Sequence, residues 1–225
     1  MPEFFIEIGS EEIPSGYIQP ALEYMRDELA SFFSNNRIQS ETPQILGTPR
    51  RLVVSVKGVD ALQEDSVDLF HGPAVSVAFD DKGEPTKAAI GFALGKGLDV
   101  SALTRESTPK GEVVCARVEK KCRPTLEHLN EFLPQFIGNI PFPKKMRWGS
   151  KARHFARPLH WIAAIFDGKP IQFSFDGIAC GDFSLGHRFL KPDKFQVKNL
   201  SSYMEQSANH YLMVDPELRK QKILE

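Results

Sequence analysis

The chain has 225 residues, which is enough for one large domain or two small ones with a buried core. Its 41% hydrophobic and 25% charged residues are typical of an ordinary globular protein. The formal net charge of −1 excludes recognition of nucleic acid by overall charge, so any such site must depend on a local patch.

Neither the cysteines nor the apolar segments point to an oxidising compartment or a membrane. Cys115, Cys122 and Cys180 are an odd number without metal-like or disulfide-like spacing, which favours reduced thiols. The first residues carry acids and no basic leader, and the apolar run 159–166 is far shorter than the ~20 residues that span a bilayer. We therefore expect a soluble, cytoplasmic protein with no membrane partner.

The first part of the chain is predicted to alternate strand and helix. Residues 4–8 predict a short strand that ends at Gly9. From Tyr17 to Phe33 apolar residues recur in steps of three and four, which predicts an amphipathic helix that ends at Asn35-Asn36. The β-branched run 52–56 predicts another strand.

Turn signals dominate residues 71–111. Asp80-Asp81-Lys82-Gly83 follows the apolar run 75–79 and suits a tight reversal. A short helix is predicted to begin at Pro85-Thr86 and a strand to cover 113–118. Pro124 then begins a helix with apolar positions as far as Ile137, which Pro134 should kink or end.

The remaining segments predict the strands 161–166, 171–175 and 183–189 and the helices 199–209 and 216–225. The fold class is therefore α+β, with mixed or antiparallel sheets, amphipathic helices and two subdomains. We expect residues 1–65 plus 143–195 to form the main domain and 66–142 an inserted subdomain. Residues 196–225 should begin a helical region of a longer protein, because the last helix has no cap and no glycine.

No catalytic constellation is recognisable. The glycines between Gly91 and Gly97 lack both the P-loop and the dinucleotide-binding spacing, and a helix end explains them better. The six histidines are scattered without a metal-binding pair, so we expect no metal site and no cofactor. Glu7, Glu11 and Glu12 could form a paired-carboxylate site, although a solvated turn or a partner contact explains them more simply.

One segment has the composition of an RNA-contacting surface. No acid occurs between Lys144 and Phe166, and aromatic residues are interleaved with cations. The candidate contacts are Lys144, Lys145, Arg147, Lys151, Arg153 and Arg157, with Arg50, Arg51, His187 and Arg188 as a possible extension. The alternative is a basic loop whose aromatics Trp148, Phe155 and Trp161 are buried in the core, and composition does not separate the two.

Several short motifs occur in a fixed order along nearly the whole chain. They are Ile6-Glu-Ile-Gly-Ser-Glu-Glu-Ile-Pro14, Thr48-Pro-Arg-Arg-Leu52, Gly72-Pro73, Ala78-Phe-Asp80, Gly83-x-Pro-Thr86, Ala88-Ala89-x-Gly-Phe-Ala93, Lys110-Gly-Glu112, Pro143-Lys-x-Met-Arg-Trp-Gly149, Phe155-x-Arg-Pro-x-His-Trp161 and Gly186-His-Arg-Phe189. In this order they resemble the bacterial glycyl-tRNA synthetase beta subunit family, with Ser10 where threonine is common.

This resemblance implies a heterotetrameric glycine–tRNA ligase of two alpha and two beta chains. It places the ATP, Mg²⁺ and glycine site on the alpha subunit, and it makes tRNA-Gly, the alpha subunit and the second beta subunit the expected partners. The chain would then contribute assembly and tRNA docking but no catalytic residue. The rival hypotheses are a free-standing RNA-binding module, and a small hydrolase built on Glu7, Glu11 and Glu12.

Overall fold

The computed structural model describes residues 2–109, 111–120, 122–148 and 154–225. Contacts divide the chain into unit 1, Met1–Gln63 with Arg123–Glu225, and unit 2, Glu64–Cys122. The elements are α+β, as predicted. None of the helices in these described ranges combines the length and the apolar character that crossing a bilayer requires.

Unit 1 is built on a seven-stranded sheet whose central strands are antiparallel. Along its main path the order is β2 (Gln44–Thr48), β3 (Arg51–Val56), β1 (Phe4–Ser10), β7 (Leu159–Phe166), β10 (Ile178–Gly181) and β9 (Ser174–Phe175), and β8 (Lys169–Pro170) pairs with β7. β1 pairs with β3 and with β7, so segments from the two ends of the chain share one sheet.

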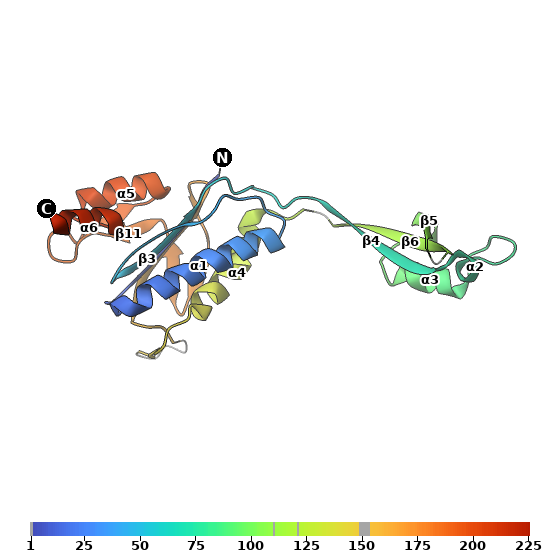
Figure 1. Ribbon diagram of the computed structural model, residues 1–225, viewed down its shortest axis with the longest axis horizontal. Helices are drawn as coiled ribbons and strands as arrows, with labels where there is room; N and C mark the ends of the chain where they lie inside the picture. The colour runs from blue at the N-terminus through green and yellow to red at the C-terminus, as the bar shows by residue number, and fades with distance from the viewer. Residues whose placement is uncertain (1, 110, 121, 149–153) are drawn as a thin grey trace. The chain divides into compact units, whose positions relative to one another are not determined.

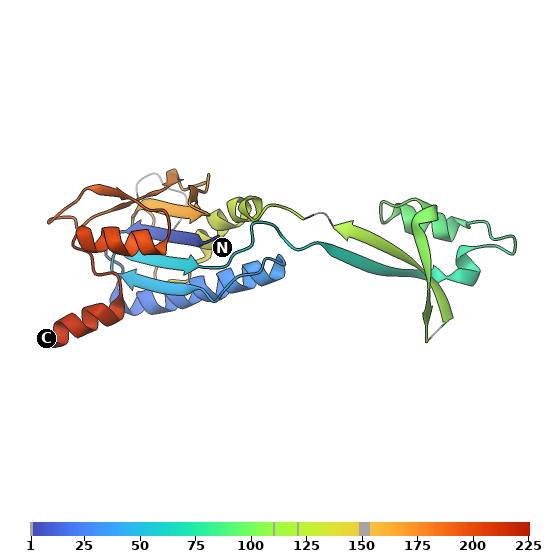
Figure 2. The same cartoon turned by 90° about the horizontal axis from the view of Figure 1, so that it is seen from above.

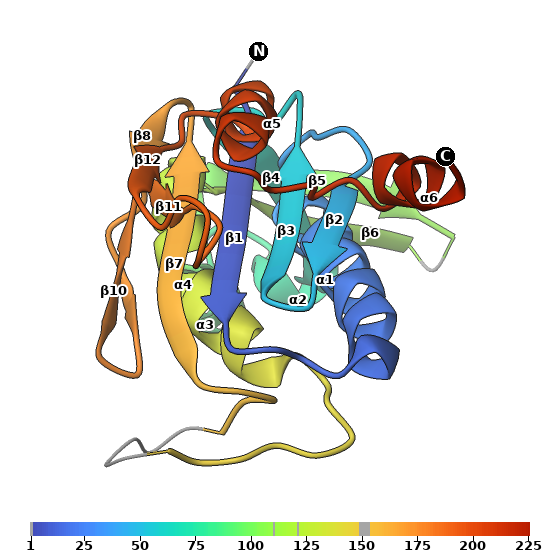
Figure 3. The same cartoon turned by 90° about the vertical axis from the view of Figure 1, so that its left-hand side faces the viewer.

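Helices cover both faces of this sheet (Figure 3). α1 (Ser15–Asn35) and α4 (Thr125–Asn139) pack on one face, where Phe4, Ile6 and Ile8 point. α5 (Leu200–Asn209) packs on the other face against Phe5. Because both faces are covered, every residue of β1 is buried, including Glu7.

Pro134 neither ends α4 nor removes its packing, and the helix continues to Asn139. An interior proline costs a helix about 3 kcal/mol. Leu129, Leu133, Phe136 and Ile137 are buried against the core, and each such side chain contributes roughly 1.5–3 kcal/mol. Tertiary burial therefore outweighs the local penalty, and of the two predicted effects of Pro134, a kink or an end of the helix, the end is wrong.

Unit 2 is a three-stranded antiparallel sheet with short helices on one face (Figures 1 and 2). The strand order is β4 (Ser66–Ala74), β6 (Gly111–Lys120) and β5 (Leu103–Thr108). α2 (Val75–Ala78), α3 (Lys87–Leu94) and a 3₁₀ turn (Val100–Ala102) cover one face through a small core of Ala78, Ala89 and Val114. No described residue forms a core on the opposite face of this sheet.

The unit boundaries differ from the expected ones at two places. Residues 123–142 belong to unit 1 and not to the insertion, because the apolar face of α4 joins the main core. Residues 196–225 also belong to unit 1, since Leu200 and Tyr203 of α5 are buried against the sheet. The last helix, α6 (Pro216–Leu224), buries no residue.

Other local predictions held in part. The reversal at Asp80 is confirmed, because Phe79 and Pro85 form an antiparallel bridge, but the preceding run 75–79 includes the helical turn α2. The predicted strands 171–175 and 183–189 are short: β9 covers Ser174–Phe175, and β11 (Phe183–Leu185) pairs with β12 (Lys194–Gln196). The strands β2, β4, β5, β8, β10 and β12 were not predicted.

Candidate functional site

Glu7 is the centre of a buried polar network on the α5 face of the sheet. Arg51 Nη1 donates to its Oε1 at 2.8 Å, and Tyr203 Oη donates to the same oxygen at 2.8 Å. Trp161 Nε1 donates to Oε2 at 2.9 Å, and the Arg51 guanidinium lies 4.8 Å from the Trp161 ring centre. Burial, and next the charge of Glu7, raises the pKa of Tyr203 well above its usual value, so this hydroxyl remains a donor.

The remaining donors of Arg51 tie the network to the segment around β11. Nη1 also donates to Ser184 Oγ at 2.9 Å, and Nη2 donates to the carbonyl oxygens of Leu185 at 2.6 Å and Gly186 at 3.3 Å. The Arg51 side chain is only 5% exposed. Arg51 is therefore poorly placed for the expected tRNA contact, because its side chain is buried and both of its Nη groups donate to groups inside the protein.

This network explains why separate sequence motifs contain the residues they do. The four motifs concerned are Ile6–Pro14 with Glu7 and Gly9, Thr48–Leu52 with Arg51, Phe155–Trp161 with Trp161, and Gly186–Phe189 with Gly186. A Cβ on Gly9 would overlap the indole ring of Trp161, so this position requires glycine. Motifs far apart in the sequence thus meet at one place in the fold.

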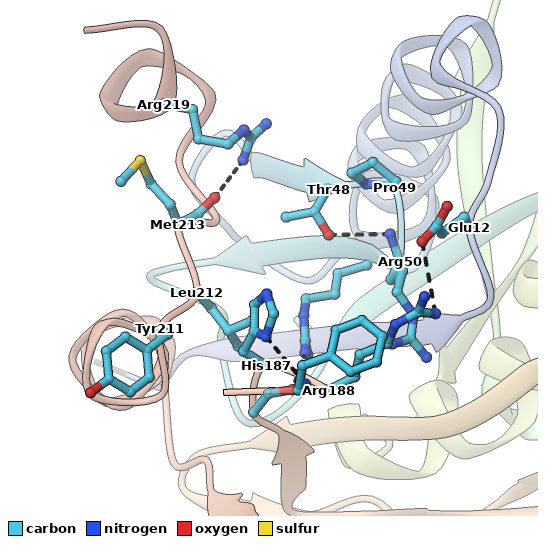
Figure 4. A pocket seen from close by; sticks show the side chains of 13 residues that line it. Glu12, Thr48, Pro49, Arg50, His187, Arg188, Tyr211, Leu212, Met213 and Arg219 are labelled. Atoms are coloured by element: carbon cyan, nitrogen blue, oxygen red, sulfur yellow. Dashed lines mark hydrogen bonds and ion pairs between the residues drawn. The ribbon is translucent and has the colours of Figure 1, made fainter. Parts of the chain in front are cut away.

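An open pocket of about 520 Å³ lies beside the network (Figure 4). Its lining residues of basic type are Arg50, Arg51, His187, Arg188 and Arg219, and its other lining residues are Glu12, Thr48, Pro49, Gly186, Phe189, Tyr211, Leu212 and Met213. The structure thus brings together Arg50, Arg51, His187 and Arg188, which the sequence places in two distant pairs. Phe189 is 75% exposed and Tyr211 is 65% exposed.

Basic side chains lie close to Glu12, which lines the pocket, and to its neighbour Glu11. His160 Nε2 lies 2.7 Å from Glu11 Oε1, and Arg50 Nη2 and Arg188 Nη1 lie 3.7 and 3.8 Å from the same carboxylate. The hydrogen bond from His160, and next the charges of Arg50 and Arg188, lower the pKa of Glu11. Arg188 Nη1 also lies 3.8 Å from Glu12 Oε1.

This arrangement overturns the hydrolase hypothesis. Glu7 is fully buried and paired with Arg51, so it cannot reach a substrate. Glu11 is held ionised by its neighbours, so it lacks the raised pKa that a general acid needs near neutral pH. The three carboxylates do not form a catalytic pair.

The basic segment after α4 is only partly an exposed surface. Lys144, Lys145 and Arg147 are exposed, and Lys145 Nζ donates to the Gly138 carbonyl oxygen at 3.2 Å. Partial burial lowers the pKa of Lys145. Arg157 Nε donates to the Glu12 carbonyl oxygen at 3.0 Å, which connects this segment to the pocket. The candidates Lys151 and Arg153 lie outside the described residues.

The aromatic residues of the segment are core residues. Phe155 and Trp161 are 1% and 3% exposed, and Trp148 packs against the main core. These aromatic side chains are therefore not available to stack on bases. This agrees with the alternative interpretation, in which they are buried in the core. The exposed rings are instead those of Phe189 and Tyr211, which sequence analysis missed. Phe189 follows Arg188 directly in the Gly186-His-Arg-Phe189 motif, and this adjacency was the available signal.

Comparison with known proteins identifies the family. The profile described as Glycyl-tRNA synthetase beta subunit matches residues 4–225. The chain is 47% identical over 224 residues to the glycine–tRNA ligase beta subunit of Geobacter metallireducens, with 100% of the chain covered. It is 48% identical over 221 residues to that of Geobacter sp. strain M21 and 41% identical over 223 residues to that of Syntrophus aciditrophicus, with 98% and 99% covered.

Each of these alignments covers 32% of the relative, so the chain spans about a third of the length of the curated proteins it matches. The family profile nevertheless matches almost all of the chain, in agreement with the ordered motifs. The chain belongs to the glycyl-tRNA synthetase beta subunit family.

Proposed function

We propose that the chain is the amino-terminal part of the beta subunit of a cytoplasmic glycine–tRNA ligase, in which it serves tRNA docking and subunit assembly. The names of the relatives support the activity and a partner chain. In this proposal an alpha subunit binds ATP, Mg²⁺ and glycine, and two alpha and two beta chains form the enzyme. The lack of a catalytic carboxylate pair among Glu7, Glu11 and Glu12 is consistent with a site on another chain.

The observation that carries the docking proposal is the pair Arg188 and Phe189. The Arg188 guanidinium lies 4.6 Å from the Phe189 ring centre, and both side chains are exposed at the open pocket. A cation beside an exposed ring can bind a phosphate and stack an unpaired base at the same time. Exposed tRNA nucleotides offer both groups.

Further exposed cations adjoin this pair through Arg157. Arg157 Nη1 lies 3.9 Å from Met146 Sδ, and its Nε contacts Glu12, which in turn lies beside Arg188. Lys144 and Arg147 are exposed on the same segment as Met146, and no ion pair to either is found among the described residues. We call Lys144, Arg147, Arg157, Arg188 and Phe189 the docking face.

The test uses the full-length beta subunit bound to its alpha subunit, and measures tRNA-Gly affinity as a function of salt concentration. Arg188→Ala should lower the salt slope by roughly 0.7–0.9, since one phosphate contact is lost. Phe189→Ala should weaken binding by about 1–3 kcal/mol and leave the slope unchanged, because stacking releases no counterions.

Lys169→Ala is the matched control. Lys169 is an exposed cation on β8, which pairs with the Phe166 end of β7, away from the Leu159 end that adjoins the docking face. This variant should keep both affinity and slope. If folded Arg188→Ala and Phe189→Ala enzymes bind tRNA with wild-type affinity and slope, the docking face is not a tRNA contact, and the family assignment is unaffected.

A further inference from the structure

Three side chains of metal-ligating type converge in unit 2. His71 comes from β4, Glu106 from β5 and Cys115 from β6. Their potential ligand atoms all lie within 4.8 Å of one another. His71 and Glu106 are 35 residues apart along the chain, and Glu106 and Cys115 are 9 apart. Their spacing in the sequence therefore does not indicate a metal site.

The strand register explains how they meet. His71 is the direct partner of Cys115 across the β4–β6 ladder, and Thr104 is its partner across the β5–β6 ladder. Glu106 lies two residues beyond Thr104, on the same face because side chains alternate along a strand. Val114, next to Cys115, belongs to the core on the helix-covered face, so the three side chains share the opposite face.

The distances suit a small tetrahedral cation. Glu106 Oε2 lies 3.1 Å from His71 Nε2 and 3.2 Å from Cys115 Sγ. Zinc binds nitrogen, carboxylate oxygen and thiolate sulfur at about 2.0–2.3 Å, which places neighbouring ligand atoms roughly 3–4 Å apart. Two of the three separations therefore already lie in this range, and the third, between His71 and Cys115, is at most 4.8 Å.

We propose that His71, Glu106 and Cys115 form a Zn²⁺ site on the open face of unit 2, with the fourth position left to solvent. The ligand set of imidazole, carboxylate and thiolate is one that zinc accepts. The His71 and Glu106 side chains are 55% and 46% exposed, so the ion can enter from solvent. Cys115 is buried beneath them and would be the innermost ligand.

The three side chains also influence one another electrostatically. Burial, and next the hydrogen bond and charge of Glu106, raises the pKa of Cys115, while Arg117 opposes this effect. Hydrogen bonds from Cys115 and from His71 lower the pKa of Glu106, to which Arg117 also contributes. Zinc would bind the thiolate form of Cys115, and the thiol proton would pass to solvent.

Such a site would tie all three strands of unit 2 together. The buried core of this unit is small: apart from Cys115, the fully buried apolar residues described in it are Ala78, Ala89, Ala93, Val114 and Ala116. A ligand that binds only the folded state stabilises it by mass action. Zinc would therefore make up for limited apolar burial in this unit.

The test titrates the purified chain with Co²⁺ in a thiol-free reductant and records the thiolate-to-cobalt charge-transfer band, then displaces Co²⁺ with Zn²⁺. We expect the band in the wild type and its loss in Cys115→Ser. His71→Ala and Glu106→Gln should each weaken binding at least about ten-fold, since each removes one ligand. Cys122→Ser is the matched control and should retain the band and the affinity.

The folded state of each variant is checked by far-ultraviolet circular dichroism without metal. Absence of the band in the folded wild type would overturn the proposal. So would a band that survives in Cys115→Ser or disappears in Cys122→Ser, because the metal would then be bound elsewhere. Unchanged affinity in both His71→Ala and Glu106→Gln would likewise refute the three-ligand site.

Discussion

Glu7 is a carboxylate without exposed surface whose charge is balanced by Arg51. Glu7→Gln should preserve most of the shape of the site but leave the Arg51 charge buried without a counter-charge. Breaking one partner of a buried ion pair costs about 3–5 kcal/mol. We expect the free energy of unfolding to fall by this amount, measured by urea denaturation with tryptophan fluorescence, since Trp148 and Trp161 both lie in unit 1.

Two further variants separate charge burial from general disturbance. Glu7→Gln combined with Arg51→Met removes both charges, so the double variant should lose less stability than the sum of the single ones. Glu11→Gln alters a carboxylate that is 39% exposed, so its loss should stay below about 1 kcal/mol. A Glu7→Gln protein as stable as the wild type would show that the Glu7–Arg51 ion pair does not stabilise unit 1.

Among the elements, α5 and α6 have similar N-terminal caps but different packing. Asn199 Oδ1 accepts from Ser202 N at 2.8 Å and forms a capping box for α5, and Asp215 Oδ1 accepts from Glu217 N at 2.8 Å for α6. α5 buries Leu200 and Tyr203 and so holds the hydroxyl that donates to Glu7. α6 buries no residue.

The cap of α5 should therefore matter more to unit 1 than that of α6. Asn199→Ala should lower the free energy of unfolding by about 1 kcal/mol, while Asn199→Gly should cost only a few tenths. Asp215→Ala should leave the main unfolding transition nearly unchanged, because a helix that buries no residue opens locally. Urea denaturation measures all three, and equal losses for Asn199→Ala and Asp215→Ala would contradict the difference in packing.

At the scale of the whole molecule, unit 2 is an insertion whose two connections are paired. Leu62 and Pro124 form an antiparallel bridge, and Thr125 N donates to the Ala61 carbonyl oxygen at 2.9 Å. The chain therefore leaves and re-enters unit 1 at adjacent positions. Insertions of this kind place little strain on their host, since the loop ends already meet.

Replacing residues 64–122 by a short glycine-containing turn should leave unit 1 folded. The shortened chain should keep a cooperative fluorescence transition close to that of the intact chain, because none of the described residues of unit 2 belongs to either core of unit 1. Circular dichroism measures whether the shortened chain is folded, and thermal melting measures its melting temperature against that of the intact chain. A shortened chain that fails to fold, although its turn length is varied, would show that unit 1 depends on unit 2.

The sequence by itself determined the elements with strong local signals. The apolar stripe between Tyr17 and Phe33 and the β-branched run before Val56 correspond to α1 and β3. The predicted helices 199–209 and 216–225 correspond to α5 and α6, whose starts are capped by Asn199 and Asp215 in the structure. The ordered motifs also identified the family, because their order is far more specific than any single one.

Only the tertiary structure decided which side chains meet and which are buried. The polar residues Glu7 and Arg51 became partners because β1 and β3 pair under α5, and no local pattern encodes that register. The tertiary structure also decided that the Trp161 side chain is buried and the Phe189 side chain is exposed. His71, Glu106 and Cys115 come from three strands, two of which sequence analysis did not predict, so their cluster arises from sheet pairing alone. Long-range pairing depends on the burial of whole faces, which a local sequence window does not contain.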